Sequence, residues 1–420
     1  MNLKPYKSYK DSNINWIGEI PEHWDVAFLK RFVYSISSGK TKNIDENGRY
    51  PLYGSTGIIG STNNLDYNGI FVLIARVGAN AGKTHIAKGK MGITDNTLIV
   101  NYIPIINYKF LFYMLSNYDF KTLTIGSGQP LITGNDVKNI KFCIPNLNEQ
   151  KQIANYLDNK IAKIDETIAK NEELIQLLEE KRIALINQAV TKGLNPDVPM
   201  KDSGIEWIGE IPKQYIVTKL KFLTSKIGSG KTPKGGSEIY VSEGIPLLRS
   251  QNIHFDSIRL DDVVFITNEI NQDMISTVVK NHDVLLNITG ASIGRCNYID
   301  NIDTANVNQH VCIVRPNEKI FYKYLNYFLQ SECGQNQVFS NQNGTSREGL
   351  NFEELSNFYI ILPKDINEQK RLALYLENEI NKIYSTINKI EENIHLLEEY
   401  KTSLIHHVVT GKIDVRGEEI

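Results

Sequence analysis

Two long stretches of the chain place apolar residues at alternating steps of four and three. In the first stretch these positions are Leu157, Ile161, Ile164, Ile168, Ile175 and Leu178. The second stretch repeats the spacing with Leu376, Ile380, Ile383, Ile387, Ile394 and Leu397. A heptad spacing of this kind predicts two long α-helices, each with one apolar stripe that faces a partner helix.

Both predicted helices carry start and stop signals. Asn146 precedes Glu149 by three residues, and Asp365 precedes Glu368 by the same step, an arrangement that resembles a capping box. A glycine lies at the end of each stretch, as is common where helices stop.

The expected partner of each helix is the other one. A helix of about 44 residues would be roughly 65 Å long, and it cannot bury its stripe alone. Gly193, at the end of the first helix, lies eight residues before Lys201, where the next repeat begins. If the region that follows is compact, the first helix ends near the start of the second, which favours an antiparallel pair. Two helices that each bind a helix of another protein are the alternative.

The regions before the two helices form an internal repeat with short strand patterns. Trp-Ile-Gly-Glu-Ile-Pro, Ser-Gly-Lys-Thr and Asn-Glu-Gln-Lys each occur twice. They occupy residues 16–21 and 207–212, 38–41 and 229–232, and 148–151 and 367–370. The order along the chain is therefore globule, helix, globule, helix.

The expected fold class is α+β with a pseudo-twofold internal repeat. Two globular α/β domains are separated by two long helices that pair as an antiparallel coiled coil. The predicted boundaries are residues 1–146 and 194–365 for the domains, 147–193 and 366–412 for the helices, and 413–420 for a tail.

Composition narrows the possible settings of the protein. No apolar run approaches the ~18 residues of a membrane helix, so a cytoplasmic location is expected. The four cysteines show no Cys-x-x-Cys pair and are expected to be buried free thiols. A net charge of −2 is unusual for a nucleic-acid-binding chain, so a local patch or a partner would have to supply positive charge.

One turn-like motif recurs with a cation behind it. Residues 78–83 and 290–295 both read Gly-Ala-x-x-Gly, followed by Lys83 or Arg295. Glycines let a turn approach a ligand closely, and the cation can meet a phosphate or a guanine edge. A tight hairpin with a solvated cation explains the same pattern.

Several enzyme classes conflict with the sequence. A phosphate-binding loop needs a further glycine separated by four residues from its Gly-Lys pair, and at this position the chain has Tyr34 and Ser225. Glu149 and Lys151 resemble half a nuclease site but lack an upstream Asp on a strand. The chain has no Pro-Pro pair, which excludes the usual adenine methyltransferase motif, and no metal site is expected. We therefore interpret the chain as non-catalytic.

The repeated motifs together resemble the DNA-specificity subunits of type I restriction–modification systems. Asn-Glu-Gln-Lys leads into Ile-Ala-x-Tyr-Leu at 153–157 and Leu-Ala-x-Tyr-Leu at 372–376, and Trp-Ile-Gly-Glu-Ile-Pro opens both copies. The segment 344–350 and the pair Asn308-Gln309 add to the likeness, which extends from about residue 10 to 412.

The resemblance implies two target-recognition domains that each read half of a split site in double-stranded DNA. It also implies that the paired helices set the spacer and dock two methyltransferase (modification) subunits, which are joined by restriction and translocase subunits. No cofactor is expected in this chain, because S-adenosylmethionine, ATP and Mg would belong to the partner subunits.

The two recognition domains differ in sequence, so their half-sites are expected to differ. Residues 53–57 read Tyr-Gly-Ser-Thr-Gly, whereas residues 248–252 read Leu-Arg-Ser-Gln-Asn. Arg, Lys, Asn and Gln are the side chains that read base edges. The predicted DNA-contacting residues are Lys40, Arg76, Lys83 and Gln129 in the first domain, and Lys231, Arg249, Arg295, Asn308, Gln309 and Arg347 in the second.

The sequence leaves three alternatives open. The chain could be a coiled-coil interaction scaffold that does not bind DNA, or a self-sufficient nuclease or NTPase. It could also be the specificity subunit of a related system in which nuclease and methyltransferase are fused.

Overall fold

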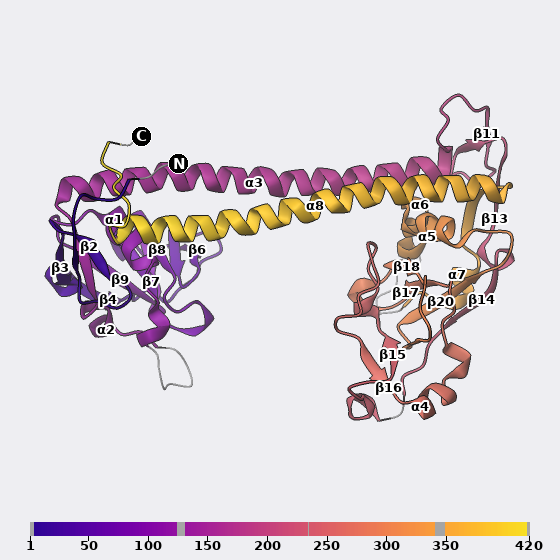
Figure 1. The fold of residues 1–420 in the computed structure, drawn as a ribbon, viewed down its shortest axis with the longest axis horizontal. Coiled ribbons are helices and arrows are strands. Elements are labelled where there is room, and N and C mark those ends of the chain that lie inside the picture. Colours follow the sequence, from indigo (N-terminus) through magenta and orange to yellow (C-terminus); the bar gives the residue numbers. More distant parts are fainter. Residues whose placement is uncertain (1–3, 124–130, 234, 341–348, 418–420) are drawn as a thin grey trace. The chain divides into compact units, whose positions relative to one another are not determined.

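The chain forms two compact units in the computed structural model (Figure 1). The structure describes residues 4–123, 131–233, 235–340 and 349–417, with only the backbone of residues 236 and 237. Unit 1 comprises residues 1–171 and 392–420, and unit 2 comprises residues 172–391. Each unit therefore contains one globular region and a part of both long helices.

Unit 1 is built around a six-stranded sheet with the strand order β4-β9-β7-β8-β5-β6. Two smaller sheets pair β1 with β2 and β3 with β10, all antiparallel. The strands are β1 (Tyr9–Asp11), β2 (Glu19–Pro21), β3 (Asp25–Phe28), β4 (Val33–Ser38), β5 (Tyr50–Gly54), β6 (Gly57–Thr62), β7 (Tyr67–Ala75), β8 (Thr84–Ile93), β9 (Thr97–Tyr102) and β10 (Lys141–Ile144).

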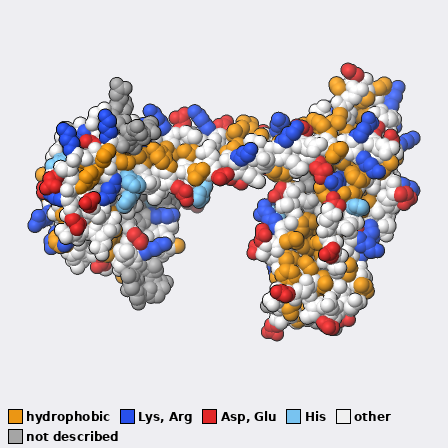
Figure 2. Space-filling model, in the orientation of Figure 1, with side chains coloured by type: hydrophobic (Ala, Val, Ile, Leu, Met, Phe, Trp, Pro, Cys, Tyr) orange, Lys and Arg blue, Asp and Glu red, His pale blue; other side chains and the backbone are white. Residues whose placement is uncertain are grey.

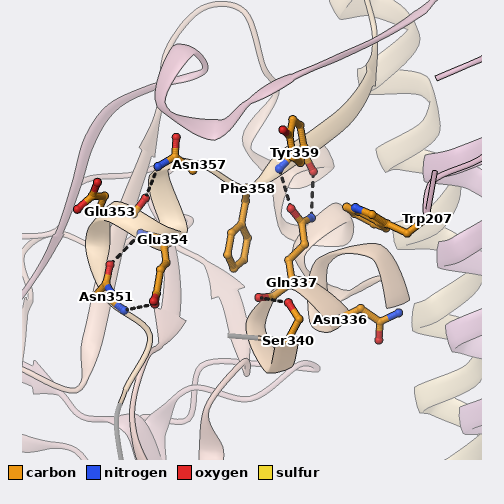
Figure 3. A pocket seen from close by; sticks show the side chains of 10 residues that line it. All are labelled: Trp207, Asn336, Gln337, Ser340, Asn351, Glu353, Glu354, Asn357, Phe358 and Tyr359. Atoms are coloured by element: carbon orange, nitrogen blue, oxygen red, sulfur yellow. Dashed lines mark hydrogen bonds between the residues drawn. The ribbon is translucent and has the colours of Figure 1, made fainter. Parts of the chain in front are cut away.

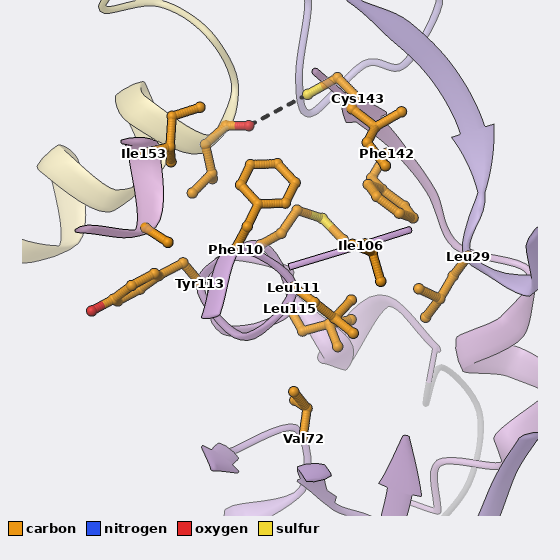
Figure 4. Packing of buried hydrophobic residues seen from close by; sticks show 14 of the residues in the cluster. Leu29, Val72, Ile106, Phe110, Leu111, Tyr113, Leu115, Phe142, Cys143 and Ile153 are labelled. Atoms are coloured by element: carbon orange, nitrogen blue, oxygen red, sulfur yellow. Dashed lines mark hydrogen bonds between the residues drawn. The ribbon is translucent and has the colours of Figure 1, made fainter. Parts of the chain in front are cut away.

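The core of unit 1 joins this sheet to the helices α1 (Tyr108–Ser116) and α2 (Gly134–Lys138). The Asn107 side chain caps α1 by accepting hydrogen bonds from two backbone N–H groups of its first turn. Figure 4 shows Phe110 of α1 in the cluster that contains Phe142 and Ile153, so α1, β10 and the first long helix share one core.

Unit 2 repeats this plan with the sheet divided in two. A four-stranded sheet has the order β14-β20-β17-β18, and a three-stranded sheet has the order β16-β15-β19. The strands are β11 (Met200–Asp202), β12 (Glu210–Pro212), β13 (Tyr215–Lys219), β14 (Thr224–Ser229), β15 (Ile245–Leu248), β16 (Val264–Ile266), β17 (Val284–Asn287), β18 (Cys296–Tyr298), β19 (Asn306–Val307), β20 (Val311–Pro316) and β21 (Tyr359–Pro363).

The division has a simple cause. In unit 1 the ten-residue strand β8 pairs with β7 along most of its length and then with β5, which makes one continuous sheet. In unit 2 the corresponding segment is interrupted between β18 and β19, so β18 pairs with the strand β17 and β19 with the strand β15.

Short helices complete both units. Unit 2 contains α4 (Asn268–Asp273), α5 (Tyr322–Gln330), α6 (Glu332–Ser340) and α7 (Phe352–Ser356). Single 3-10 turns are η1 (Leu29–Arg31), η2 (Gly78–Asn80), η3 (Phe120–Leu123), η4 (Leu220–Phe222), η5 (Gly236–Ile239), η6 (Ser250–Asn252), η7 (Ile275–Thr277) and η8 (Gly290–Ser292).

The long helices α3 (Leu147–Lys192) and α8 (Ile366–Val409) run antiparallel within each unit. In unit 1 the start of α3 and the end of α8 share a core, and Lys401 Nζ lies 2.6 Å from Asp165 Oδ1. In unit 2 the end of α3 packs on the start of α8, and the buried Arg182 guanidinium lies over the ring of Tyr384. The predicted α+β fold with an antiparallel helix pair is confirmed.

The twelve predicted seam residues are all buried or half-buried. The buried ones are Leu157, Ile161, Ile164, Leu376, Ile380, Ile383 and Ile387, and the half-buried ones are Ile168, Ile175, Leu178, Ile394 and Leu397. The helix α8 ends at Val409, three residues before the predicted boundary at 412. At this end the Thr410 hydroxyl donates to the carbonyl of His406.

Candidate nucleic-acid interface

The repeated Ser-Gly-Lys-Thr motif follows β4 in unit 1 and β14 in unit 2. Its glycine lies directly against the backbone of a neighbouring loop. A Cβ atom added to Gly39 would lie 2.3 Å from the carbonyl oxygen of Ile93, and one added to Gly230 would lie 1.7 Å from that of Val307. Close backbone approach therefore explains why glycine recurs there, without a phosphate-binding loop.

The repeated Gly-Ala-x-x-Gly motif forms a tight turn in both units. It connects β7 to β8 through η2, and β17 to β18 through η8. Gly78 and Gly82 have φ values of +73° and +93°, and Gly290 and Gly294 have values of +75° and +84°. These left-handed conformations favour glycine, and the flanking strands pair antiparallel, so the hairpin interpretation of the motif is correct for its backbone.

Matching backbone hydrogen bonds hold these turns and two further loops together in each unit. In unit 1 the donor–acceptor pairs are Gly39–Thr97 (2.9 Å), Thr94–Tyr53 (3.0 Å), Arg76–Asn96 (3.0 Å) and Gly82–Ala75 (2.8 Å). In unit 2 they are Gly230–Val311 (3.2 Å), Asn308–Leu248 (3.1 Å), Ile288–His310 (3.0 Å) and Gly294–Asn287 (2.9 Å). We call each set of four hydrogen-bonded loops the reading frame of its unit. The term here means the backbone that carries the candidate DNA-reading side chains, and it has no relation to codons.

The reading frame of unit 1 carries three of its four predicted DNA-contacting residues. Lys40 has a side chain that is 67% exposed, with Nζ 3.7 Å from Asp66 Oδ1. Arg76 is half-buried and donates from Nη1 to the carbonyl of Asp95 at 3.5 Å. Lys83 is exposed. Gln129 lies outside the described residues, and the roles of all four in DNA contact remain predictions.

The reading frame of unit 2 carries five of its six predicted residues. Lys231 and Gln309 are exposed, whereas Arg249, Arg295 and Asn308 are half-buried. Within the described ranges, no hydrogen bond or ion pair engages the charged groups of Lys231 and Arg295. Such cations suit phosphate contacts. Arg347 lies outside the described residues, and these assignments also remain predictions.

Three polar residues of this frame were missed as site residues. Thr232 donates a hydrogen bond to Gln309 Oε1, and Gln309 Nε2 lies 2.9 Å from His310 Nε2. The other ring nitrogen of His310, Nδ1, lies 2.5 Å from Thr289 Oγ1. The run of polar residues from 308 to 310, directly before an apolar strand, was the available signal.

Positive and negative side chains are interspersed on the face of each unit that Figure 2 shows. This mixture accords with the net charge of −2. Phosphate binding depends on positive charge. The described reading frames contain only a few cations that could supply it.

A pocket of about 780 Å³ in unit 2 lies apart from the reading frame (Figure 3). Its polar side chains largely serve the fold. Gln337 exchanges hydrogen bonds with the backbone of Tyr359, and Asn351 forms a capping box with Glu354. Trp207 lines the pocket with 49% of its surface exposed. None of the eight predicted DNA-contacting residues that the structure describes lines it.

The repeated Asn-Glu-Gln-Lys motif attaches each globular region to its long helix. The buried Gln150 accepts a hydrogen bond from the N–H of Asn107 (2.8 Å) and donates one to the carbonyl of Pro145 (2.9 Å). Gln369 makes the matching bonds in unit 2, with the N–H that precedes α5 and the carbonyl at the end of β21, both at 2.8 Å. This role was also missed, because one partner of each glutamine lies 43 or 48 residues away in the sequence.

The predicted capping box at the start of α3 is only half formed, because the side chain of Glu149 binds other residues. Asn146 does accept a hydrogen bond from the N–H of Glu149 at 3.0 Å. However, the buried Glu149 carboxylate accepts bonds from Tyr6 Oη (2.9 Å), Trp24 Nε1 (3.0 Å) and His23 Nε2 (2.9 Å). Burial and the neighbouring carboxylate raise the pKa of Tyr6, so its hydroxyl remains a donor.

Other candidate chemistry is limited in the described part of the chain. Cys143, Cys296 and Cys312 are buried free thiols, and burial raises the pKa of Cys143 and Cys312 to about 12. Within residues 4–123, 131–233, 235–340 and 349–417, no three His, Cys, Asp or Glu side chains are placed to hold a metal ion. Nor is any helix in these ranges long and apolar enough to cross a membrane.

A family model described as the type I restriction modification DNA specificity domain matches residues 21–177 and 215–396. The chain belongs to this family. One match covers each copy of the internal repeat, so the chain contains two specificity domains. The resemblance inferred from the sequence motifs is confirmed, and the family is non-catalytic, as we interpreted the chain to be.

Individual specificity proteins support this assignment. The chain is 29% identical over 432 residues to the type I restriction enzyme MjaVIII specificity subunit of Methanocaldococcus jannaschii, with 97% of this chain and 98% of the relative covered. It is 27% identical over 269 residues to the EcoBI specificity subunit of Escherichia coli, covering 60% and 56% of the two chains. A solved structure on assembly and conformational transition of the type I R-M system shares the fold, with a TM-score of 0.69, 15% identity and coverage of 93% and 98%.

Proposed function

We propose that each specificity domain reads one half of an asymmetric, bipartite site in double-stranded DNA. The observation that carries this proposal is a shared reading frame with different side chains. The loop before β9 presents Asp95 and Asn96 in unit 1, whereas the loop before β20 presents Gln309 and His310 in unit 2. Identical readers would favour an inverted repeat, and different readers favour half-sites of different sequence.

The proposal assigns the spacing of the half-sites to the long helices. The 46 residues of α3 correspond to about 69 Å, or about 20 base pairs of B-form DNA, which sets an upper limit to the spacing. We further assign most phosphate contacts to partner subunits, because the net charge of this chain is −2.

Two modification subunits are the proposed partners of the helices. Leu177 of α3 and Leu396 of α8 occupy equivalent positions in the repeat, and they are 53% and 54% exposed. Two equivalent apolar positions suit two copies of one partner. S-adenosylmethionine, ATP and Mg would then be bound by the modification and restriction subunits, and the complex would act in the cytoplasm.

Native mass spectrometry of the assembled complex tests this docking. Leu177→Glu and Leu396→Glu should each reduce the bound modification subunits from two to one, and the double variant should bind none. The matched controls, Gln176→Glu and Asn393→Glu, add the same charge at exposed neighbours and should retain both copies. Two bound copies in the double variant would contradict the assignment.

Genome-wide mapping of methylated adenines tests the DNA-reading function. Cells with this gene and its modification subunit should show one bipartite motif with unequal halves, and cells without this gene should show none. The same adenines methylated in both strains, or no motif in either, would favour an interaction scaffold without a DNA role.

A further inference from the structure

The exposed side chain of Gln309 is held from both sides. Its Oε1 accepts a hydrogen bond from the Thr232 hydroxyl, and its Nε2 lies 2.9 Å from His310 Nε2. His310 is in turn fixed through Nδ1, which lies 2.5 Å from Thr289 Oγ1. An exposed glutamine normally samples many rotamers, so this chain of bonds restricts a side chain that solvent would leave free.

The partners are chemically compatible with the amide in this orientation. An amide nitrogen can only donate, so His310 Nε2 here accepts from Gln309 Nε2. The ring is then neutral with its proton on Nδ1, which donates to Thr289. The Thr232 hydroxyl donates to Oε1. If the amide were turned over, its oxygen would accept from the other imidazole tautomer and its nitrogen would donate to the Thr232 hydroxyl, so either orientation uses one donor and one acceptor.

The backbone supports the same arrangement. Gly230 allows the loop that carries Thr232 to lie against the carbonyl oxygens of Val307 and Asn308. The N–H of Asn308 donates to the carbonyl of Leu248 at 3.1 Å, which anchors the other side of the loop. The glutamine and its two neighbours thus project from backbone that is fixed by the reading frame.

The amide has one donor and one acceptor position left. Each amide oxygen accepts two hydrogen bonds and each amide nitrogen donates two, and one of each is used internally. Adenine presents an acceptor at N7 and a donor at N6 in the major groove, whereas guanine presents acceptors at both N7 and O6. A held amide with one free donor and one free acceptor therefore matches adenine.

We infer that Gln309 reads one adenine in the half-site of unit 2, and that Thr232 and His310 are positioning residues for its amide. This inference rests on the proposed function, since it requires that unit 2 reads DNA. Unit 1 lacks the device, because Asp95 stands at the equivalent position and Thr41 turns inward to Asp66. The two half-sites should therefore differ in this feature.

Replacement of single adenines by 7-deazaadenine tests the contact directly. The assembled complex of this chain with its modification subunits would be titrated with cognate duplexes that carry one such replacement each. Loss of the N7 acceptor at one adenine of the second half-site should weaken binding by roughly 2- to 12-fold. Gln309→Ala should show no further loss at that adenine. The inference is wrong if no adenine there responds, or if the variant retains the response.

A nearly isosteric variant tests specificity without removing the side chain. Gln309→Glu replaces the donor by an acceptor, which suits the N4 amino group of cytosine. Methylation mapping should show that adenine is no longer preferred at one base pair of the second half-site. Discrimination for adenine there should fall by about 5- to 150-fold, and the first half-site should be unchanged. Gln214→Glu, at an exposed glutamine in the turn after β12, is the control and should leave the motif intact.

The outcomes separate this inference from the proposed function. If the parent chain yields no bipartite motif, the proposed function fails. If the parent yields a motif and Gln309→Glu leaves it unchanged, or alters several base pairs, only the inference fails. Thr232→Val should lower discrimination at the same base pair alone, and Thr232→Ser should restore it, which a general loss of structure would not do.

Discussion

The buried carboxylate of Glu149 accepts three side-chain hydrogen bonds in unit 1, whereas its counterpart Glu368 is half-buried in unit 2 and accepts none from the described residues. The next residue in the motif behaves differently, because Gln150 and Gln369 make matching bonds in both units. Within this repeated motif, therefore, the glutamine stabilises the fold of both units, whereas the glutamate makes side-chain hydrogen bonds in unit 1 alone among the described residues.

The reading frames show the same division. Gly39 and Gly230 both lie against a neighbouring backbone. The threonine two residues later differs between the units. Thr41 is buried and donates to Asp66 at 2.6 Å, whereas Thr232 is exposed and donates to Gln309. The two units thus share these backbone contacts. The neighbouring threonine is buried and stabilises the fold in unit 1, whereas it is exposed to solvent in unit 2.

The largest effect is expected where the shared backbone contact is broken. Gly39→Ala and Gly230→Ala each force a Cβ atom into a carbonyl oxygen, and each should destabilise its own unit by roughly 3 kcal/mol. Hydrogen–deuterium exchange of peptides from each unit measures this effect. Gly228→Ala is the control, because no heavy atom lies within 4 Å of the added Cβ. Equal exchange in all three variants would contradict the packing requirement.

The next largest effect is expected at the shared glutamines. Gln150→Leu and Gln369→Leu would each leave a buried N–H and a buried carbonyl without their partner. Each should lower the free energy of unfolding of its unit by about 2–3 kcal/mol, as measured by exchange at the start of the long helix. A large effect in one unit only would show that the two attachments are not equivalent.

The glutamates should respond unequally. Glu149→Gln removes a charge that three donors surround and should destabilise unit 1 by about 2 kcal/mol. Glu368→Gln should change unit 2 by no more than about 0.5 kcal/mol. Chemical denaturation, monitored by hydrogen–deuterium exchange of peptides from each unit, measures the free energy of unfolding of both units. Similar losses in both units would remove the distinction between them.

The smallest expected effect depends on pH and concerns the end of α8. Burial, with smaller effects from His407 and Lys412, lowers the pKa of His406. The folded state therefore takes up a proton less readily than the unfolded state, and stability should fall as the pH drops below about 6.5. Asn187, the matched residue of α3, has no charge to titrate.

Exchange at the end of α8 between pH 7 and pH 5 tests this difference. His406→Asn should reduce the acid sensitivity of that segment, and His395→Asn, at an exposed histidine of the same helix, should not. If His406→Asn leaves the pH dependence unchanged, another group accounts for it.

The long helices were predictable because their signal is local and repetitive. Heptad spacing places Leu157 and Leu376 in equivalent, buried positions. The start of α3 was also predictable from Asn146, whose side chain caps the helix.

Contacts between remote residues were not predictable in the same way. The spacing of Asn146 and Glu149 favours a capping box, but Tyr6 and Trp24 compete for the carboxylate from more than a hundred residues away. Thr41 and Thr232 occupy the same motif, and only the tertiary structure shows that one is buried and the other exposed. The order of motifs identified the family, whereas the hydrogen bonds that hold Gln309 required the structure.

The frame that supports the reading loops consists of main-chain hydrogen bonds. An exposed side chain on such a loop can be exchanged without the loss of any of these bonds, so a substitution at position 309 carries little thermodynamic penalty for folding. Under the proposed function, a single substitution there would redirect one half of the recognised sequence while the other half and the architecture persist.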